Sequence, residues 1–433
     1  MNSTSDSSSV ISEPPFDPQE PVRTTTHLEL SNRRHKINQY KRGARIGKGK
    51  HGEVYLCEDE SDAGREVALK VVKRSSPRDK IKLLRKNYRT ENGKPPLNST
   101  ENSVRKEIAI MKKCRHAHLV RLLEVIDDPQ QEKIYIAMEY LSGGPVEWAN
   151  ADHEPILSLD QTRRITRDVV NGLEYLHSHG IIHRDIKPAN LIYTHNRTNV
   201  KIIDFGVAHF TPKRLKFYQR THTQDILEDL ALFPEADLLK RTGTPSFLAP
   251  EVVWFPPGTN EHEQPRTSLS QSSVKSDSSS ATMGSSTAIP LKRPPITKAI
   301  DVWSLGVTFY CLLFGRTPFN VPLSTNENVH HNEFMLYNQI CTQDWTVPNT
   351  MGSEGLATGG RHPKDPFSEG FVIIQLLDRM FQKNPRLRIH LEDVKRHPWF
   401  LQNIANPREW IRVTTPVEAQ GISMCQWFRH LWK

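Results

Sequence analysis

The sequence has few cysteines and no long uninterrupted hydrophobic run, and these shortages exclude several classes of protein. The 433 residues include five cysteines, widely spaced and none in a Cys-x-x-Cys pair. We therefore expect neither a zinc site nor a disulfide framework, and we place the chain in a reducing compartment. No stretch is apolar for the length that a bilayer crossing needs, and the first thirty residues lack the apolar core of a signal peptide. These absences predict a cytoplasmic chain without a membrane span, with access to the nucleus left open.

Aromatic residues are scarce where the positive charge gathers. The formal net charge is +9, and the basic residues concentrate only between Lys73 and Lys94, where Tyr88 is the single aromatic residue. A single-strand nucleic-acid binder would interleave aromatic side chains with its cations as a stacking platform. We therefore expect no nucleic-acid partner. A binder driven by charge alone remains an alternative, which predicts steep salt dependence of binding.

The first half of the chain predicts a disordered start followed by a small sheet. Residues 1–38 are poor in large apolar groups and predict disorder. A glycine-rich turn at 46–54 lies between two strand candidates, residues 67–72 and 134–138 read as buried strands, and residues 139–144 form a polar hinge. Residues 73–103, broken by proline and glycine, predict an insertion, and a helix is expected over 104–113.

The second half predicts helices. Ser158 and Gln161 form a capping box for a helix that Gly180 ends. Residues 300–314 are apolar nearly all round, which indicates a helix buried on every side and ended by Gly315. The Ser/Thr/Pro-rich residues 258–296 predict an unstructured insertion. The fold class is therefore α+β.

The most informative stretch is His183 to Leu191, which places an acid, a base and an amide at fixed offsets in one loop. Asp185 can accept the proton of an attacking hydroxyl, Lys187 can offset charge on a transferring phosphoryl group, and Asn190 can bind Mg²⁺. A solvated polar turn would explain a His-Arg-Asp triplet alone. It does not explain the lysine and asparagine at these offsets. The stretch predicts a phosphoryl-transfer loop.

The glycine-rich turn is ambiguous by itself, and the residues after it decide between two folds. Gly47, Gly49 and Gly52 suit both a dinucleotide fold and a phosphoryl-transfer fold. A dinucleotide fold would continue into a helix, whereas here a strand follows and ends in a Val-Ala-x-Lys element. We therefore expect Lys70 to pair with nucleotide phosphates while Glu107 holds it. A snorkelling surface lysine is the alternative for Lys70.

Asp204 is the second metal-ligand candidate. It follows two isoleucines and precedes Phe205-Gly206, so a buried strand can present its carboxylate at the floor of a cleft. An ordinary Asp-x-Gly turn would be the alternative if the catalytic-loop candidate did not precede it. We assign Asp204 and Asn190 as ligands of Mg²⁺.

Together these motifs resemble the eukaryotic protein kinases over residues 40–400. The resemblance implies a bilobal fold, with a small antiparallel sheet and one main helix at about 40–138, a large, mostly helical lobe at about 142–400, and a tail at 401–433. It also implies a Glu251–Arg388 pair and an Asp301 that holds the catalytic-loop backbone. ATP and Mg²⁺ are the implied cofactors. The residues assigned to the nucleotide site are Ile46, Gly47, Lys48, Gly49, Gly52, Val54, Ala68, Lys70, Glu107, Met138, Glu139, Leu141 and Ile192.

Finer features resemble the calcium/calmodulin-dependent protein kinase kinases and their fungal relatives that activate the yeast homologue of AMP-activated kinase. The cues include residues 124–129, the turn at 144–146 and the segment 243–251. Lys187 and Thr244 match the serine/threonine type. The resemblance implies protein substrates, in particular the activation segments of other kinases. A pseudokinase scaffold and a serine/threonine kinase of another subfamily are the alternatives.

Two aspects of regulation stay open at the level of sequence. Arg184 could await a phosphate on Thr223 or Thr242, or the acidic stretch 225–237 could neutralise it, and we favour constitutive activity. The tail after Trp399 could form a calmodulin-binding helix, but its prolines favour packing on the large lobe. The physiological substrate, the upstream signal and the oligomeric state are not encoded in any motif of the chain.

Overall fold

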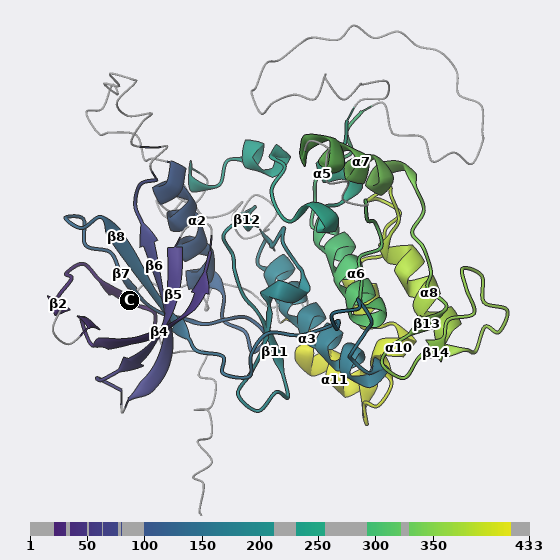
Figure 1. The fold of residues 1–433 in the computed structure, drawn as a ribbon, viewed down its shortest axis with the longest axis horizontal. Helices are drawn as coiled ribbons and strands as arrows, with labels where there is room; N and C mark the ends of the chain where they lie inside the picture. The colour runs from purple at the N-terminus through teal and green to yellow at the C-terminus, as the bar shows by residue number, and fades with distance from the viewer. Residues whose placement is uncertain are drawn as a thin grey trace, which may run out of the picture.

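The structure, a computed structural model, divides into a sheet-containing part and a mostly helical part, on the left and right of Figure 1. It describes residues 21–31, 35–49, 52–62, 64–76, 79, 99–211, 231–255, 292–321 and 329–416. Within these ranges, none of the helices combines the length and the hydrophobicity that crossing a bilayer requires.

Eight strands form the main sheet, in the order β1-β7-β8-β6-β5-β4-β3-β2. All neighbouring pairs are antiparallel except β1 and β7, which run parallel. The sheet is therefore not the purely antiparallel one that we predicted. The strands are β1 (Arg23–Thr25), β2 (Leu30–Ser31), β3 (Lys36–Ile37), β4 (Tyr40–Lys48), β5 (Gly52–Asp59), β6 (Arg65–Lys73), β7 (Leu122–Ile126) and β8 (Lys133–Glu139).

The two faces of this sheet bury different apolar clusters. Along β6, Val67 and Leu69 contribute to a small cluster with Leu28 and Tyr40, whereas Val72 belongs to the large core shared with the helices. Side chains alternate across a strand, so each face of β6 needs its own cover. Helix α2 (Ser99–Lys113) and the helical part cover one face, and the N-terminal residues help to cover the other.

The prediction of disorder over residues 1–38 is wrong for residues 21–31 and 35–38, which are ordered into β1–β3 and the turns around them. β1 pairs with β7 in the register Arg23 to Glu124, and Leu28 and Ile37 are buried. Backbone pairing holds this segment, although its composition is polar. Arg23 also contacts two buried acids, Asp59 and Glu124. Residues 1–20 lie outside the described ranges.

The edges of both predicted insertions are also more ordered than expected. Helix α2 starts at Ser99 rather than 104, because the Asp79 carboxylate accepts hydrogen bonds of 2.6 Å from both Ser99 Oγ and Thr100 Oγ1. At the end of the second insertion, Arg293 donates to the carbonyl oxygens of Glu251 (2.8 Å) and Val252 (2.9 Å). A guanidinium can satisfy several carbonyl groups at once, which fixes residues 292–296. The rest of both insertions, at 80–98 and 256–291, falls outside the described ranges.

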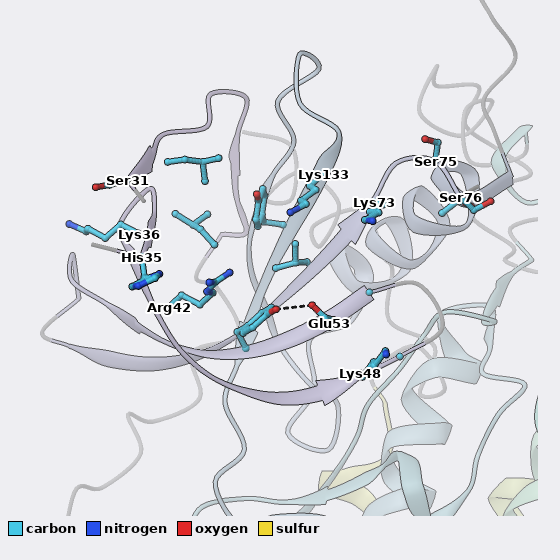
Figure 2. A pocket seen from close by; sticks show the side chains of 18 residues that line it. Ser31, His35, Lys36, Arg42, Lys48, Glu53, Lys73, Ser75, Ser76 and Lys133 are labelled. Atoms are coloured by element: carbon cyan, nitrogen blue, oxygen red, sulfur yellow. Dashed lines mark hydrogen bonds between the residues drawn. The ribbon is translucent and has the colours of Figure 1, made fainter. Parts of the chain in front are cut away.

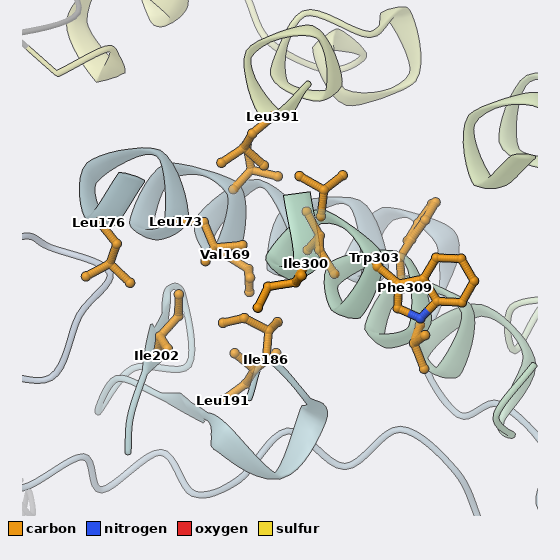
Figure 3. Packing of buried hydrophobic residues seen from close by; sticks show 14 of the residues in the cluster. Val169, Leu173, Leu176, Ile186, Leu191, Ile202, Ile300, Trp303, Phe309 and Leu391 are labelled. Carbon is orange, nitrogen blue, oxygen red and sulfur yellow. The ribbon is translucent and has the colours of Figure 1, made fainter. Parts of the chain in front are cut away.

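Helices α3 (Leu159–Ser178) and α6 (Ala299–Phe314) form the centre of the helical part (Figure 3). The predicted capping box is confirmed, since Gln161 N donates to Ser158 Oγ at 3.1 Å and Ser158 N to Gln161 Oε1 at 2.9 Å. The prediction that α6 is buried nearly all round and ends at Gly315 is also confirmed. Gly315 has a φ of +68° and lies so close to His153 and Pro155 that a side chain would clash.

Shorter elements complete the helical part and connect it to the sheet. Two small antiparallel pairs, β9 with β12 and β10 with β11, frame the predicted catalytic loop. The remaining elements are β9 (Ile181–Ile182), β10 (Leu191–Tyr193), β11 (Val200–Ile202), β12 (His209–Phe210), β13 (Thr350–Met351), β14 (Leu356–Ala357), α5 (Pro250–Val253), α7 (Val329–Thr342), α8 (Glu369–Met380), α9 (Leu391–Lys395), α10 (Pro398–Leu401) and α11 (Pro407–Thr414), with single 3₁₀ turns η2 (Pro188–Asn190), η4 (Glu235–Leu239) and η5 (Pro245–Phe247).

The described part of the tail contacts the helical part, as the packing interpretation predicted. Trp410 of α11 lies under the Lys395 ammonium, which is 5.4 Å from the ring centroid. Asn403 Nδ2 donates to Asp160 Oδ1 of α3 at 3.1 Å. The residues on which a calmodulin-binding helix would depend, from Trp427 to the end, lie outside the described ranges. Calmodulin binding therefore stays the less favoured alternative.

Candidate active site

The loop between β9 and β10 places its acid where three polar groups meet it. Asp185 Oδ1 accepts hydrogen bonds from the backbone nitrogen (2.9 Å) and hydroxyl (2.7 Å) of Thr244, and its Oδ2 lies 2.8 Å from the Lys187 ammonium. Asn190 Nδ2 donates to the Asp185 carbonyl at 2.8 Å. The loop residues that we predicted to act together are therefore in direct contact. The sequence pattern did not indicate that Thr244 would contact the acid itself.

This environment keeps the Asp185 carboxylate charged. Burial would raise its pKa, but hydrogen bonds from Lys187 and Thr244 outweigh burial, and the net effect is a lowered pKa. Asp185 is 8% exposed, so the charge faces the protein more than the solvent. A carboxylate that is charged and tied to a hydroxyl is suited to accept a proton from a second hydroxyl that takes the place of Thr244.

Helix α6 fixes the backbone of the loop between β9 and β10 through Asp301. The Asp301 carboxylate accepts hydrogen bonds from the backbone nitrogens of His183 (2.9 Å) and Arg184 (2.8 Å) and lies 2.8 Å from His177 Nε2. Asp301 is fully buried. Although burial opposes ionisation, contacts with His177 and with the loop lower its pKa. The predicted contact of Asp301 with the loop backbone is present, whereas no sequence pattern had indicated His177.

The segment that follows β11 presents the second acid. Asp204 adopts a φ of +64° and accepts a hydrogen bond from Gly206 N at 3.1 Å. Phe205 is buried and its ring packs edge-on against His183, with centroids 5.3 Å apart. The backbone nitrogen of Ile203 donates to the Asn190 carbonyl at 2.9 Å. Asp204 therefore projects, exposed, from a strand pair that also carries the catalytic-loop candidate.

Lys70 on β6 faces these groups. Its ammonium pairs with Glu107 of α2, as predicted, and the Glu107 side chain is only 4% exposed. Burial by itself would lower the pKa of Lys70, but the charges of Glu107 and Asp204 raise it. A Cβ built on Gly206 would lie 3.1 Å from Asp204 Oδ1 and 3.9 Å from Glu107 Oε2. Gly206 therefore lies between the two carboxylates, where a side chain would crowd Asp204. The snorkelling alternative for Lys70 is thus excluded by its buried partner.

The glycine-rich turn lies at the ends of β4 and β5. Gly49 N donates to the Gly52 carbonyl at 2.8 Å, and a Cβ on Gly52 would lie 2.1 Å from the Val71 carbonyl oxygen, so only glycine fits there. Val54 is the register partner of both Gly47 and Lys70, which places the turn beside the lysine. Residues 50 and 51 fall outside the described ranges.

The other residues assigned to the nucleotide site lie on the sheet, just after β8 or on β10. Ala68 pairs with Met138 across β6 and β8, Leu141 is buried, and Ile192 lies on β10. Ile46 on β4 is 44% exposed. Glu139 differs from the others, because its carboxylate is taken up by Lys201 (2.7 Å) and by the Arg121 backbone nitrogen (2.7 Å). The backbone nitrogen of Glu139 donates to the Arg121 carbonyl at 3.0 Å, so neither this N–H nor the carboxylate is left for a nucleotide.

A separate hollow of about 550 Å³ lies on the other face of the sheet (Figure 2). Basic side chains line it, among them Arg42, Lys73 and Lys133. Val71, which also lines it, alternates with Lys70 along β6 and points the opposite way. Lys48, Gly49 and Gly52 of the glycine-rich turn also line this hollow. None of the predicted catalytic or metal-binding residues does, so we do not assign it to the chemistry.

Two long-range contacts stabilise the segment between Asp204 and Glu251. Glu251 and Arg388 form a fully buried pair with distances of 2.7 and 2.9 Å, as predicted. The Arg184 guanidinium donates to the Lys240 carbonyl at 2.7 Å, and burial lowers its pKa to about 10. Of the predicted phosphorylation candidates, Thr242 has a buried hydroxyl with no hydrogen-bond partner among the described residues, and Thr223 lies outside them.

The donors around Asn190 and Asp204 suit a hard cation. The described residues contain no cluster of three or more His, Cys, Asp or Glu side chains that could share a metal ion. One exposed carboxylate and one amide oxygen fit Mg²⁺, which keeps several water ligands and takes the remaining ones from substrate phosphates. They do not fit Zn²⁺, which prefers four protein ligands rich in nitrogen and sulfur.

Comparison with known proteins places this geometry in a family. The family model described as "Protein kinase domain" matches residues 40–270 and 271–400. The chain is 37% identical over 384 residues to serine/threonine-protein kinase ssp1 of Schizosaccharomyces pombe, a match that covers 88% of this chain and 45% of that protein. It is 35% identical over 370 residues to serine/threonine-protein kinase TOS3 of Saccharomyces cerevisiae, covering 84% of this chain and 53% of that protein.

A third relative bears a more specific name. SNF1-activating kinase 1 of Saccharomyces cerevisiae is 33% identical over 392 residues, which cover 87% of this chain and 30% of that protein. The chain thus spans about half or less of the length of these relatives.

Proposed function

Because this chain belongs to the protein kinase domain family, we propose that it transfers the γ-phosphoryl group of ATP to serine and threonine hydroxyls of proteins. The observation that carries the proposal is the position of the Asp185 carboxylate, which is charged and hydrogen-bonded to a threonine hydroxyl at 2.7 Å. In the reaction, a substrate hydroxyl takes the place of the Thr244 hydroxyl. Its oxygen bonds to the γ-phosphorus, its proton passes to Asp185, and the bond to the β-phosphate oxygen breaks to release ADP.

The other side chains bind and orient the reactants. Lys187, which contacts both Asp185 and Thr244, offsets negative charge on the transferring group. Lys70, held by Glu107, pairs with the α and β phosphates. The glycine-rich turn closes over the phosphates with its backbone. Asn190 and Asp204 hold Mg²⁺, which when bound neutralises charge on the phosphate oxygens.

We extend the proposal to a substrate class. All three reported relatives are fungal kinases, and one of them is named for activating SNF1. We propose that this chain phosphorylates the activation segments of kinases of the AMP-activated type, in the cytoplasm. The kinase domain covers most of the chain, so both its activity and its substrate choice can be tested on this chain directly.

A phosphate-transfer assay tests the proposal. Purified chain is incubated with Mg²⁺ and ATP labelled at the γ position, and with a catalytically inactive AMP-activated-type kinase or a generic basic protein as substrate. We expect label on both, with the activation-segment threonine of the kinase labelled faster. Asp204→Asn should abolish labelling. Asparagine tolerates the left-handed backbone at this position, so the variant removes the charge without adding strain.

Asp152→Asn makes the same chemical change on an exposed loop of the helical part and should keep wild-type activity. Equal labelling by the wild type and Asp204→Asn would contradict the proposed chemistry. Absence of labelling by the wild type on every substrate would favour a pseudokinase scaffold. Labelling of the generic protein but not of the kinase would remove the substrate class and leave the activity.

A further inference from the structure

Helix α2 is held by ion pairs at two neighbouring residues. Glu107 contacts Lys70 of the sheet, and Lys106 contacts Asp237 in η4, which lies 131 residues further along the chain. Consecutive residues on a helix project about 100° apart, so a rotation of α2 that breaks one pair also displaces the other. The position of Glu107 in the candidate active site is therefore coupled to a contact outside it.

Asp237 is mostly buried and forms two ion pairs. Its side chain is 13% exposed and that of Lys106 is 18% exposed, and Lys240 makes a second ion pair with Asp237 at 2.5 Å. Burial would raise the pKa of Asp237, but hydrogen bonds from Lys106 and Lys240 lower it, so the group is charged at neutral pH. Lys240 also accepts, through its carbonyl, the hydrogen bond from Arg184.

Aromatic packing holds the same segment against α2. The Lys106 ammonium lies 5.9 Å from the Phe233 ring centroid. Phe233 packs edge-on against His209 (5.9 Å) and Phe210 (6.0 Å) of β12, and the Lys113 ammonium of α2 lies 5.0 Å from the Phe210 ring. Residues 233–240 thus connect α2, β12 and the catalytic-loop arginine.

We propose that Asp237 is a positioning residue. It holds Lys106 and so keeps Glu107 turned toward Lys70 without a phosphate on the activation segment of this chain, residues 204–251. The proposal rests on the proposed kinase activity. A phosphate in this segment would supply charge and acceptor oxygens to nearby cations, and the Asp237 carboxylate supplies part of both to Lys106. Loss of its charge removes one of the contacts that fix the rotation of α2, which weakens the hold of Lys70 on the nucleotide phosphates.

The test uses the full chain treated with phosphatase, with mass spectrometry to verify that residues 204–251 carry no phosphate. We expect Asp237→Asn to raise KM for ATP about tenfold while KM for the protein substrate changes less than twofold. Asp237→Glu, which keeps the charge, should stay near the wild type. Lys106→Gln should match Asp237→Asn, and the double variant should lose no more than either single variant, because both remove one interaction.

The matched control is Glu369→Gln, which removes one charge from another partly buried pair, with Arg163, in the helical part at 2.6 Å. It tests whether any lost ion pair weakens ATP binding, and we expect an unchanged KM for ATP. Equilibrium binding of a fluorescent ATP analogue, measured without turnover, should weaken about tenfold in Asp237→Asn and stay unchanged in Glu369→Gln.

Three outcomes overturn the inference: wild-type ATP affinity in Asp237→Asn, losses that add in the double variant, and loss of wild-type activity on phosphatase treatment. A wild type that transfers no phosphate, before or after treatment, contradicts the proposed function instead. In that case the binding measurement still decides whether Asp237 positions Lys70.

Discussion

At the scale of single residues, Asp168 of α3 combines burial with a charge that the fold does not neutralise. Burial raises its pKa to about 7 despite a 2.8 Å hydrogen bond from the Val200 backbone nitrogen. His118 Nε2 lies 3.6 Å away, but burial lowers the pKa of that imidazole, so it brings no positive charge at neutral pH. Ionisation of Asp168 therefore lowers the free energy of unfolding.

We expect the stability that Asp168 contributes to fall as pH rises. Since its pKa is higher in the folded than in the unfolded chain, the folded chain binds the extra proton between about pH 4 and 7. Asp168→Asn should therefore gain stability relative to the wild type across this window, by an amount on the order of a few kcal/mol at pH 7. Unfolding midpoints of both proteins at pH 4, 5.5 and 7 measure this. A difference independent of pH would contradict the expectation.

Site residues could be predicted from the sequence where they lie at fixed offsets in one short motif. They could not be predicted where they depend on contacts between residues far apart in the chain. Lys187 and Asn190 follow Asp185 at fixed offsets in one loop, so sequence sufficed to group them. Asp237 and Lys106 are 131 residues apart, and no local pattern pairs them. For Glu139 the sequence predicted the position in the hinge but not the role of the side chain. Its carboxylate accepts a hydrogen bond from Lys201, 62 residues further along the chain.

At the scale of elements, the added strand β1 was the largest departure from the sequence prediction. Its residues carry almost no large apolar side chains, so periodicity could not identify it. Polar contacts with buried acids of the neighbouring strands hold β1 in place. Arg23 contacts Asp59 (3.2 Å) and Glu124 (3.4 Å), and Thr25 Oγ1 donates to Glu124. By contrast, α3 and α6 carried their own signals, a capping box and a continuous apolar surface, and both were predicted closely.

Deletion of residues 1–31 should destabilise the sheet relative to deletion of residues 1–20, which leaves β1 in place. The longer deletion removes β1 and leaves Asp59 and Glu124, each 2% exposed, without the Arg23 cation. Because Arg23 itself is half exposed, we expect a cost of roughly 1–3 kcal/mol rather than that of a fully buried pair. Thermal unfolding of both truncations measures it. Identical midpoints would show that β1 adds nothing to the sheet.

At the scale of the whole molecule, the account depends on groups from both parts of the fold meeting in one place. Lys70 and Glu107 come from the sheet and α2, whereas Asp185, Asn190 and Asp204 come from the helical part. The two sets lie close together, because a Cβ built on Gly206 would lie 3.1 Å from Asp204 Oδ1 and 3.9 Å from Glu107 Oε2. The sequence predicted each set from its own motif, and only the fold brings them together.

The measurement that tests this account most directly is the turnover and ATP affinity of Asp185→Asn beside the wild type. Asparagine keeps the shape and can still accept the Thr244 hydrogen bonds, but it cannot take a proton at neutral pH. We predict that kcat falls by roughly two to four orders of magnitude, while the dissociation constant for ATP stays within a factor of about three. A variant that turns over like the wild type, or that loses ATP binding along with turnover, would contradict the role of Asp185 as the proton acceptor.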